Sequence, residues 1–483
     1  MPMSAGCAPR SGMLGAMADL FPSRLPGVLS VAFLLGGCAQ LSPEGGVGAV
    51  ATLSQARVGV ALAPIKDDAD AARVAEFVSA RLAAPLDAEG AVAIALAHSR
   101  DLQARLAGLR VAEADAVQAG RPRNPVFSFA RLAGGDLLEY ERSFLLDLLG
   151  LFTLPARAEA GRARFQAAQV ALAREVVRQA HQARQDWLDA VAARQIRLRR
   201  EAALDLAEAG AELARRMAEA GNFSAREARR AQVLRAELAA ELIQARQAQT
   251  QARERLVRRL GLGESDAARL HLPERLPELP AALPEPAGPQ AVADRLDTHL
   301  ARLETEAQTR SLDQIGATRW LSDLDLAYKN GGERGEAHWR GYEIEVGLPV
   351  FDRGEARIAA AEARLRQARF RQAAIEAAAA SELREARAGL AEAHALARLY
   401  RDEIAPLRAG LAEDALLRYN GMLVGPWDLL SETRRQVQAE AAAIVALRDY
   451  WWAESAWRMA LDVGGGEPSP LSGGHASEPD AGH

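Results

Sequence analysis

The feature that most constrains the fold of this chain is a pair of very long helical runs. The first run begins at Pro155, contains no further proline and ends about 66 residues later at Gly221. The second run begins at Gly354 and ends about 66 residues later at Asn420. At 1.5 Å per residue, a helix of about 66 residues is about 100 Å long. Helices of this length predict an elongated molecule rather than a compact globular domain.

The elements around these helices recur in one order, which indicates an internal repeat. In the first copy, a helix predicted over residues 86–120 precedes two strand-like stretches and the long helix. In the second, a helix over about 290–315 precedes two strands within 320–350 and the other long helix. Landmarks such as Phe129 and Leu326 stay about 197 to 200 residues apart. The sequence therefore predicts two copies of one plan, each closed by a further helix.

A proline-rich segment separates the two copies. The stretch HLPERLPELPAALPEPAGP can hardly be a helix or a central strand, so it is predicted to be a linker. We place the first copy at residues 85–262, the linker at 263–289 and the second copy at 290–463. The tail at 464–483 is rich in glycine and proline and is predicted to be disordered.

The strand-like stretches of the second copy alternate apolar and acidic residues. The two stretches are WLSDLDLAY (residues 320–328) and YEIEVGLP, and the polar stretch NGGERGEAH joins them. In each, one face is apolar and the other carries Asp or Glu. The apolar face is predicted to meet lipid and includes Trp320, Leu324, Leu326, Tyr342, Ile344 and Val346. The first copy is less regular, because Arg142 interrupts its apolar face.

Such strands occur in soluble sheets as well as in membrane barrels. Strands of about 9 to 11 residues with aromatic residues near their ends fit an outer-membrane barrel. Four strands cannot close one, since the smallest barrels have about eight. Open sheet edges are not tolerated in lipid. A membrane barrel would therefore have to be shared between chains.

The composition agrees with long packed helices. Hydrophobic residues make up 49% of the chain, charged residues 25% and aromatic residues only 5%. A net charge of −5 is too small to indicate a nucleic-acid partner. The first long helix carries an apolar stripe with coiled-coil spacing: Val191, Leu198, Leu206, Leu213 and Met217. Composition alone therefore favours a coiled-coil scaffold, whereas the strands favour a membrane protein.

The N-terminal region resembles the signal of a bacterial lipoprotein. Its apolar run LPGVLSVAFLL is too short to span a bilayer, which takes roughly 20 residues. The run ends in LGGC, residues 35–38, which resembles the lipobox in which the cysteine is acylated and becomes the mature N-terminus. The resemblance implies a signal peptide at 1–37, acylation of Cys38 and a lipid-anchored segment at 38–84. Ala39, in place of an Asp that would retain the protein in the inner membrane, implies the outer membrane.

The chain resembles the TolC family of outer-membrane efflux proteins over about residues 85–462, because several sequence signatures occur in the order that is typical of the family. The signatures are GRPRNPVFSF before a strand, GLPVFDRGEARIAAAEARL from strand into long helix, and the turns AGNFSAREARRAQ and RYNGMLVGPWDLL. The resemblance implies a homotrimer whose chains give four strands each to a twelve-stranded barrel on an α-helical tunnel through the periplasm. It also implies the exit duct of a tripartite pump, docked to a periplasmic adaptor and an inner-membrane transporter. Drugs, metal ions or other small solutes are the expected cargo.

The same resemblance implies which turns form the periplasmic tip and the gate. The implied tip and gate residues are Gly221, Ser224, Arg418, Tyr419, Gly421 and Asp428. The second turn departs from the family pattern, because Met422 stands where glycine is usual. Asp428 matches an acidic position of that pattern, and threefold symmetry would bring three such carboxylates into a cation-attracting ring.

The sequence predicts neither an enzyme nor a cofactor or metal site. Its histidines are scattered without metal-ligand spacing, and it has no glycine-rich phosphate loop. The energy for transport would therefore come from a partner. The alternative is a lipid-anchored periplasmic coiled-coil scaffold or adaptor, which would be extracted as a helical monomer rather than as a heat-sensitive, detergent-resistant trimer.

Overall fold

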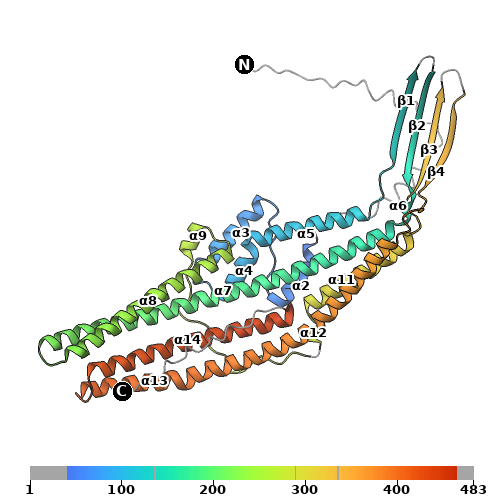
Figure 1. Ribbon diagram of the computed structural model, residues 1–483. Coiled ribbons are helices and arrows are strands. Elements are labelled where there is room, and N and C mark those ends of the chain that lie inside the picture. Colours follow the sequence, from blue (N-terminus) through green and yellow to red (C-terminus); the bar gives the residue numbers. More distant parts are fainter. Residues whose placement is uncertain (1–40, 135–136, 289, 322, 334–336, 465–483) are drawn as a thin grey trace, which may run out of the picture.

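The computed structural model describes residues 41–134, 137–288, 290–321, 323–333 and 337–464. Within these residues the molecule is elongated, with a four-stranded sheet at one end and long helices leading away from it (Figure 1). The expected signal peptide, Cys38 and nearly all of the expected tail lie outside the described residues. Within the described ranges, no helix has the length and apolar content needed to cross a membrane.

The sheet is antiparallel, and its strands lie side by side in chain order. They are β1 (Val126–Gly134), β2 (Leu137–Asp147), β3 (Leu324–Glu333) and β4 (Trp339–Val346). Each of the two predicted copies contributes one hairpin, and the pairing of β2 with β3 joins the two hairpins.

The predicted start of the third strand at Trp320 is wrong. The strand begins at Leu324 and runs on through Gly331 and Gly332, which the sequence placed in the joining loop. Pairing with β2 persists there, since Tyr140 is opposite Gly332. A Cβ at Gly331 would lie 2.4 Å from the Trp339 ring, so glycine lets that aromatic side chain cover the strand.

The helices of the first copy are α4 (Ala88–His98), α5 (Arg100–Ala119), the short α6 (Leu148–Phe152), α7 (Leu154–Glu219) and α8 (Ala225–Leu260). The 66 residues of α7 confirm the predicted long helix. The single helix predicted over 86–120 is wrong, because the chain is extended at Ser99. The Ser99 hydroxyl accepts the N–H of Leu102 at 3.4 Å and so begins a new helix as its N-cap.

The helices of the second copy are α10 (Ala291–Asp294), α11 (Leu296–Thr318), α12 (Glu355–Leu399), α13 (Ala405–Asn420) and α14 (Pro426–Asp462). One π-helical turn, Tyr400–Ile404, joins α12 to α13, so the predicted long helix is present but interrupted. Pro406 lies just after this turn. Its ring would clash with the carbonyl of Asp402 in a regular helix, and the wider turn relieves that clash.

The proline-rich linker is packed against the helices. It starts with α9 (Glu264–Arg269) and then crosses α12 and α14, where Leu279 is buried. The indole N–H of Trp451 donates to the carbonyl of Pro277 at 3.1 Å, and His394 Nε2 lies 2.9 Å from the carbonyl of Pro280. Side chains from the helices therefore bind backbone groups of the linker.

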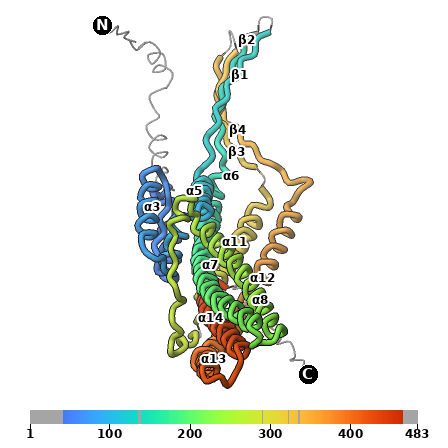
Figure 2. The backbone as a smooth tube through the Cα atoms, turned by 90° about the vertical axis from the view of Figure 1, so that its left-hand side faces the viewer, coloured from blue at the N-terminus to red at the C-terminus, as the bar shows by residue number. Residues whose placement is uncertain are grey.

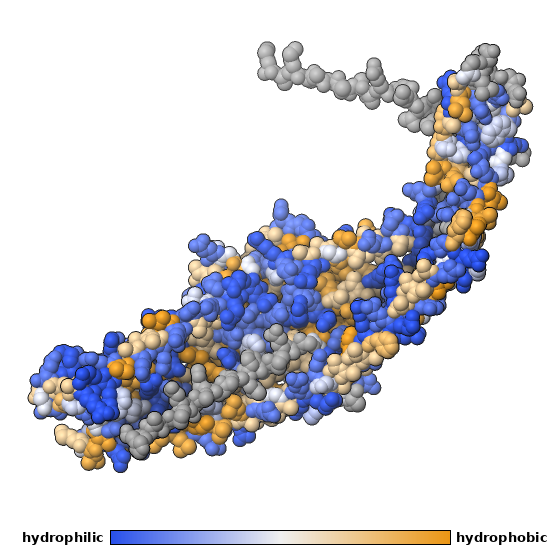
Figure 3. All heavy atoms as spheres, in the orientation of Figure 1, coloured by the Kyte–Doolittle hydropathy of each residue, from blue (hydrophilic) through white to orange (hydrophobic). Residues whose placement is uncertain are grey.

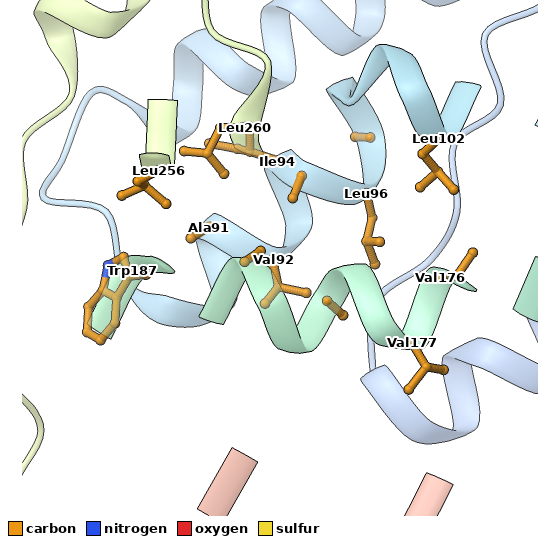
Figure 4. Packing of buried hydrophobic residues seen from close by; sticks show 14 of the residues in the cluster. Ala91, Val92, Ile94, Leu96, Leu102, Val176, Val177, Trp187, Leu256 and Leu260 are labelled. Atoms are coloured by element: carbon orange, nitrogen blue, oxygen red, sulfur yellow. The ribbon is translucent and has the colours of Figure 1, made fainter. Parts of the chain in front are cut away.

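The N-terminal segment also forms helices, which the sequence did not reveal. These are α2 (Val47–Val58), which packs on α7, and α3 (Asp68–Arg81), which packs on α4. The main core lies where α4 meets α7 and α8 (Figure 4). There Ile94, Leu96 and Leu256 are fully buried, and the indole of Trp187 donates to the carbonyl of Leu86 at 2.7 Å.

Toward the other end, the core becomes alanine-rich. The buried residues of α7 there are Ala203, Ala207, Ala211 and Ala214. Small side chains let α7, α8 and α14 approach closely, as Gly210 shows: a Cβ there would lie 2.7 Å from Leu430. The predicted leucine stripe is only partly buried, because Val191 is in the core but Leu206 is exposed. The turns between α7 and α8 and between α13 and α14 lie at the same end of the molecule (Figure 2).

Candidate functional site

One face of the sheet is apolar and aromatic in the part nearest the helices, whereas Arg142, Asn330 and Arg340 lie on the same face toward the hairpin turns. Because side chains two residues apart share a face, the pairing register gathers one set on it: Phe127, Phe144, Leu146, Leu324, Leu326, Tyr328, Tyr342, Ile344 and Val346. Directly opposed rings touch, with centroids 5.5 Å apart for Tyr328 and Tyr342. Five of the six predicted lipid-facing residues lie in this set. The sixth, Trp320, lies in the turn after α11, where its ring is 4.4 Å from the Arg319 guanidinium.

The opposite face of the sheet is polar and mainly acidic. Lys329 lies there between Glu141, at 3.6 Å, and Glu343. Asp325 and Glu345 oppose each other in the β3–β4 pairing on the same face. This side of the sheet is therefore suited to water, while the other is suited to an apolar medium.

The sheet has the dimensions of a membrane layer, and its outer strands are open. The 11 residues of β2 extend over about 36 Å, or about 28 Å at a tilt of about 40°. The apolar band of outer-membrane barrels is about 25 Å tall. Within the described chain, β1 and β4 each pair on one side only. Open strand edges require partners, which another copy of the chain could supply.

The first tip, between α7 and α8, has a regular turn chemistry. Gly221 adopts φ of 78°, a left-handed conformation that glycine takes without steric cost. The N–H of Asn222 donates to the carbonyl of Met217 at 2.9 Å and so closes the end of α7. Ser224 and Glu227 then cap the start of α8 reciprocally, each side chain accepting the other residue's backbone N–H.

The second tip repeats this turn with different residues. The left-handed residue is Met422, at φ of 57°, whereas Gly421 has an ordinary φ of −79°. The N–H of Leu423 donates to the carbonyl of Arg418 at 2.8 Å, matching the bond in the first tip. The carboxylate of Asp428 accepts the N–H of Gly425 at 3.2 Å, so this predicted gate residue also caps α14.

A groove of about 610 Å³ lies beside the second tip, between α7, α13 and α14. Its lining is largely apolar and includes Leu206, Leu213, Leu416, Tyr419, Leu429 and Leu430. Tyr419 is half-buried there, whereas Arg418 and Asp428 are exposed. The structure thus brings the six predicted tip residues to one end of the molecule, but only Tyr419 lines the groove.

Charged residues that the sequence did not single out join the two helix pairs near the tips. Arg434 of α14 pairs with Glu237 of α8 at 2.7 Å and with Glu241 at 3.5 Å. On α7, hydrogen bonds from Arg215 and Arg216 lower the pKa of Glu212 to about 2, so this carboxylate stays charged at physiological pH. The pairs within α7 could have been found in the sequence only from the i,i+3 and i,i+4 spacing of Glu212, Arg215 and Arg216. The sequence carries no such signal for the pairs of Arg434 with α8.

The described residues include a Ser–His–Asp array but no accessible catalytic site there. His181 Nδ1 lies 3.2 Å from Ser455 Oγ, and its Nε2 lies 3.8 Å from Asp462. Ser455 is 0% exposed, so a substrate could not reach its hydroxyl, and the array joins α7 to α14. Within the described ranges, no group of three or more His, Cys, Asp or Glu side chains could hold a metal ion.

Known proteins resemble the chain in structure rather than in sequence. No family model and no curated protein matches the sequence. The solved structure of CusC has a TM-score of 0.66 at 16% identity, covering 78% of this chain and 92% of that one. The outer-membrane protein VceC of Vibrio cholerae has a TM-score of 0.65 at 17% identity, covering 82% and 97%. The outer-membrane channel OprN has a TM-score of 0.63 at 20% identity, covering 82% and 91%.

The chain has the fold of outer-membrane channels. This channel fold is mainly helical with four antiparallel strands, as the resemblance to the TolC family implied. The similar structures are described as channel and membrane proteins, not as enzymes. In the channel fold, the apolar sheet and the distant helical tips are two ends of one continuous structure (Figure 1).

Proposed function

We propose that this protein belongs to the TolC family and is the outer-membrane exit duct of a tripartite efflux system. It passively conducts small solutes, such as drugs or metal ions, from the periplasm to the exterior. The observation that carries the proposal is the two-faced sheet, apolar on one side and acidic on the other, at the end of helices about 100 Å long. A coiled-coil scaffold would have no use for such a sheet.

The working unit is a homotrimer. The open edges of β1 and β4 would pair with neighbouring copies, and three copies of four strands would close a barrel with the acidic face inside. The exposed part of the leucine stripe on α7 also supports further helix contacts in an assembly. The duct binds a periplasmic adaptor, and through it an inner-membrane transporter that supplies the energy.

The protein is anchored in the outer membrane by an acyl group on Cys38. The N–H of Ser42 donates to Glu113 at 2.8 Å, on α5, six residues from the end of the helix nearest the sheet. That separation is about 9 Å along the helix, so Ser42, among the first described residues, lies near the end of α5 that leads to the sheet. Cys38→Ala should abolish incorporation of radiolabelled fatty acid, and undiminished label would refute the anchor.

The gate lies at the helical tips, where Asp428, Arg418 and Tyr419 control the passage. Three Asp428 carboxylates would attract cations, and Arg418 with Tyr419 would hold neighbouring helices shut. Because Asp428 also caps α14, Asp428→Asn is the sharper variant: it removes the charge and keeps an oxygen acceptor for Gly425. Asp428→Asn should weaken cation selectivity, and Arg418→Ser with Tyr419→Phe should raise conductance. Unchanged selectivity and conductance would place the gate elsewhere.

Planar-bilayer recordings test the proposed function directly. Purified protein should give discrete, long-lived conductance steps that favour cations, because the inner face of the sheet is acidic. A protein that binds the bilayer without conducting would support the scaffold or adaptor instead.

A further inference from the structure

A cavity of about 410 Å³ lies between α7, α11 and α12, in the helices next to the sheet. Helix α11 packs against α7 on one side and against α12 on the other, so a single chain forms its walls (Figures 1 and 2). The apolar part of its lining consists of small side chains: Ala160, Ala167 and Ala307. Binding sites for small molecules usually have volumes of about 300 to 1,000 Å³, so the cavity is large enough for a small organic solute.

Five polar side chains complete the lining of this cavity. Arg164 comes from α7, Arg364 from α12, and Glu304, Gln308 and Ser311 from one face of α11. Among the described residues, none of the five side chains has a hydrogen-bond or ion-pair partner. Figure 3 shows hydrophilic residues on the surface of the helices next to the sheet. The donors and acceptors of the cavity are therefore available to a ligand.

Other charged residues of α11 do have partners. Arg302 lies 3.5 Å from Glu376 of α12, and Arg310 lies 3.5 Å from Glu306 within α11. Guanidinium and carboxylate groups thus meet where the helices bring them together. Around the cavity, two guanidinium groups and one carboxylate are present but stay more than 4 Å apart.

The two arginines of the cavity lie at one level. They occupy equivalent positions in the two predicted copies, about 200 residues apart. At 1.5 Å per residue, Arg164, Arg364 and Gln308 each lie about 14 to 15 Å from the helix end nearest the sheet. Glu304 lies about 6 Å, or one helical turn, farther from the sheet. The cavity therefore presents two positive groups at one level and a negative group about one turn away.

We propose that this cavity binds a small zwitterionic solute with a carboxylate at one end and an ammonium group at the other. The guanidinium groups of Arg164 and Arg364 contact the carboxylate, because their planar donors match its two oxygens. Glu304 accepts the ammonium group, and Gln308 and Ser311 bond to polar atoms between the two ends. A dipeptide has a suitable length, since two extended residues cover about 7 Å. One chain forms the cavity, so binding does not depend on the proposed function.

A side chain of a second copy is the competing occupant. A carboxylate from another subunit could pair with the two arginines, but it would leave Glu304 without a partner. Helices of the same chain also flank α11 on both sides. The cavity is therefore better suited to a free solute with both charges than to a subunit contact.

Isothermal titration calorimetry on the full chain in detergent tests the proposal with three probes. Dialanine carries both charges, N-acetyl-dialanine lacks the ammonium group, and dialanine amide lacks the carboxylate. Dialanine should bind saturably, and each of the other two should bind about tenfold more weakly, because a hydrogen bond to a charged group contributes about 1.5 to 3 kcal/mol. Absence of saturable dialanine binding would overturn the site.

Substitutions assign each end of the probe to its residues. Arg164→Gln combined with Arg364→Gln should remove the advantage of dialanine over dialanine amide, and Glu304→Gln should remove its advantage over N-acetyl-dialanine. Arg162→Gln combined with Arg366→Gln is the matched control, since both arginines are exposed on the same helices but do not line the cavity.

The control pair should leave the affinity for dialanine unchanged. Equal weakening by the control pair and by the cavity pair would show that only the net charge matters, and it would overturn the site. Loss of trimer on unheated gels in the cavity pair, without dialanine binding to the unsubstituted protein, would assign the arginines to a subunit contact instead.

Discussion

Met422 lies at the one non-glycine position with positive φ among the described residues. Its counterpart in the first tip is Gly221, where the same turn carries no steric cost. A side chain in this left-handed conformation costs roughly 1 to 2 kcal/mol. Met422 is also 93% exposed, so no packing within the chain compensates for the strain. Strain retained at an exposed tip is typical of a functional contact.

Met422→Gly should therefore slow hydrogen exchange in the second tip, residues 415–430. Relief of about 1 kcal/mol corresponds to roughly fivefold slower exchange of the amides that the turn protects. Gly421→Ala is the matched control and should leave the exchange nearly unchanged. Its φ is ordinary, and an added Cβ would make only ordinary contacts at 3.5 Å. Faster exchange in Met422→Gly would contradict the strain.

Asp428 shows what a sequence can and cannot predict about a site residue. The family pattern identified an acidic position in the second tip. It did not indicate that the carboxylate accepts the Gly425 N–H, because that bond depends on the exact start of α14. Likewise Arg434 reaches Glu237 across 197 residues of chain, a contact for which the sequence carries no local signal.

At the scale of elements, the two long helices differ although their lengths agree. The helix α7 is uninterrupted, whereas a π-helical turn separates α12 from α13. Pro406 is the sequence signal for this difference, whereas the equal spacing of the repeat landmarks indicates two helices of the same kind. Within this turn, Arg401 donates to the linker carbonyl of Leu279 at 3.4 Å, and its hydrogen bond to Asp402 lowers the pKa of that carboxyl. The linker is therefore bonded to the turn that separates α12 from α13.

Pro406→Ala should raise the melting temperature of the detergent-solubilised protein, since it restores a backbone N–H and removes the ring. A proline in a regular helix costs about 3 kcal/mol, and the gain should be smaller because the π-helical turn already relieves part of the clash. Glu208→Pro, at an exposed position of the regular α7, should lower the melting temperature strongly. A fall in the melting temperature of Pro406→Ala would show that the proline is not the cause of the turn.

The strands could be predicted in their alternation but not in their ends. The apolar and acidic faces follow from a two-residue period, and the pairing register agrees with them. The strand ends depend on pairing partners. Gly331 and Gly332 are predicted as part of a loop, but both pair with β2, and Gly331 also pairs with Trp339 of β4. One consequence is that Val346 is the last residue of β4, so it lies at the edge of the membrane layer rather than at its centre.

Substitutions on β4 should therefore depend on both face and depth. Ile344→Arg should reduce trimer yield most, because arginine on a lipid-facing position costs about 2 to 4 kcal/mol at the midplane and less toward the interface. Val346→Arg should reduce the yield less, and Glu345→Gln on the water-facing side should leave it nearly unchanged. Trimer on unheated gels is the measurement, and equal loss in all three variants would contradict the orientation.

At the scale of the whole molecule, much of the surface makes sense only in an assembly. Helix α7 packs on α8 and α14 through alanines. Leu206 and Leu213 of the predicted stripe are not buried in this packing, and they line the tip groove. The edges of β1 and β4 are likewise open in one chain. The long helices and the strands could be predicted from the sequence because their periodicities are local patterns. The sequence could not show which faces meet other copies, since nothing in a local pattern distinguishes a neighbouring helix from a neighbouring subunit.

The mass of the particle extracted from outer membranes is the most direct test of a shared channel. Native mass spectrometry in mild detergent should give three copies of the mature chain in one particle, because the open edges of one four-stranded sheet can close only against other copies. A monomer from the same membranes, with its strand content intact, would contradict the account.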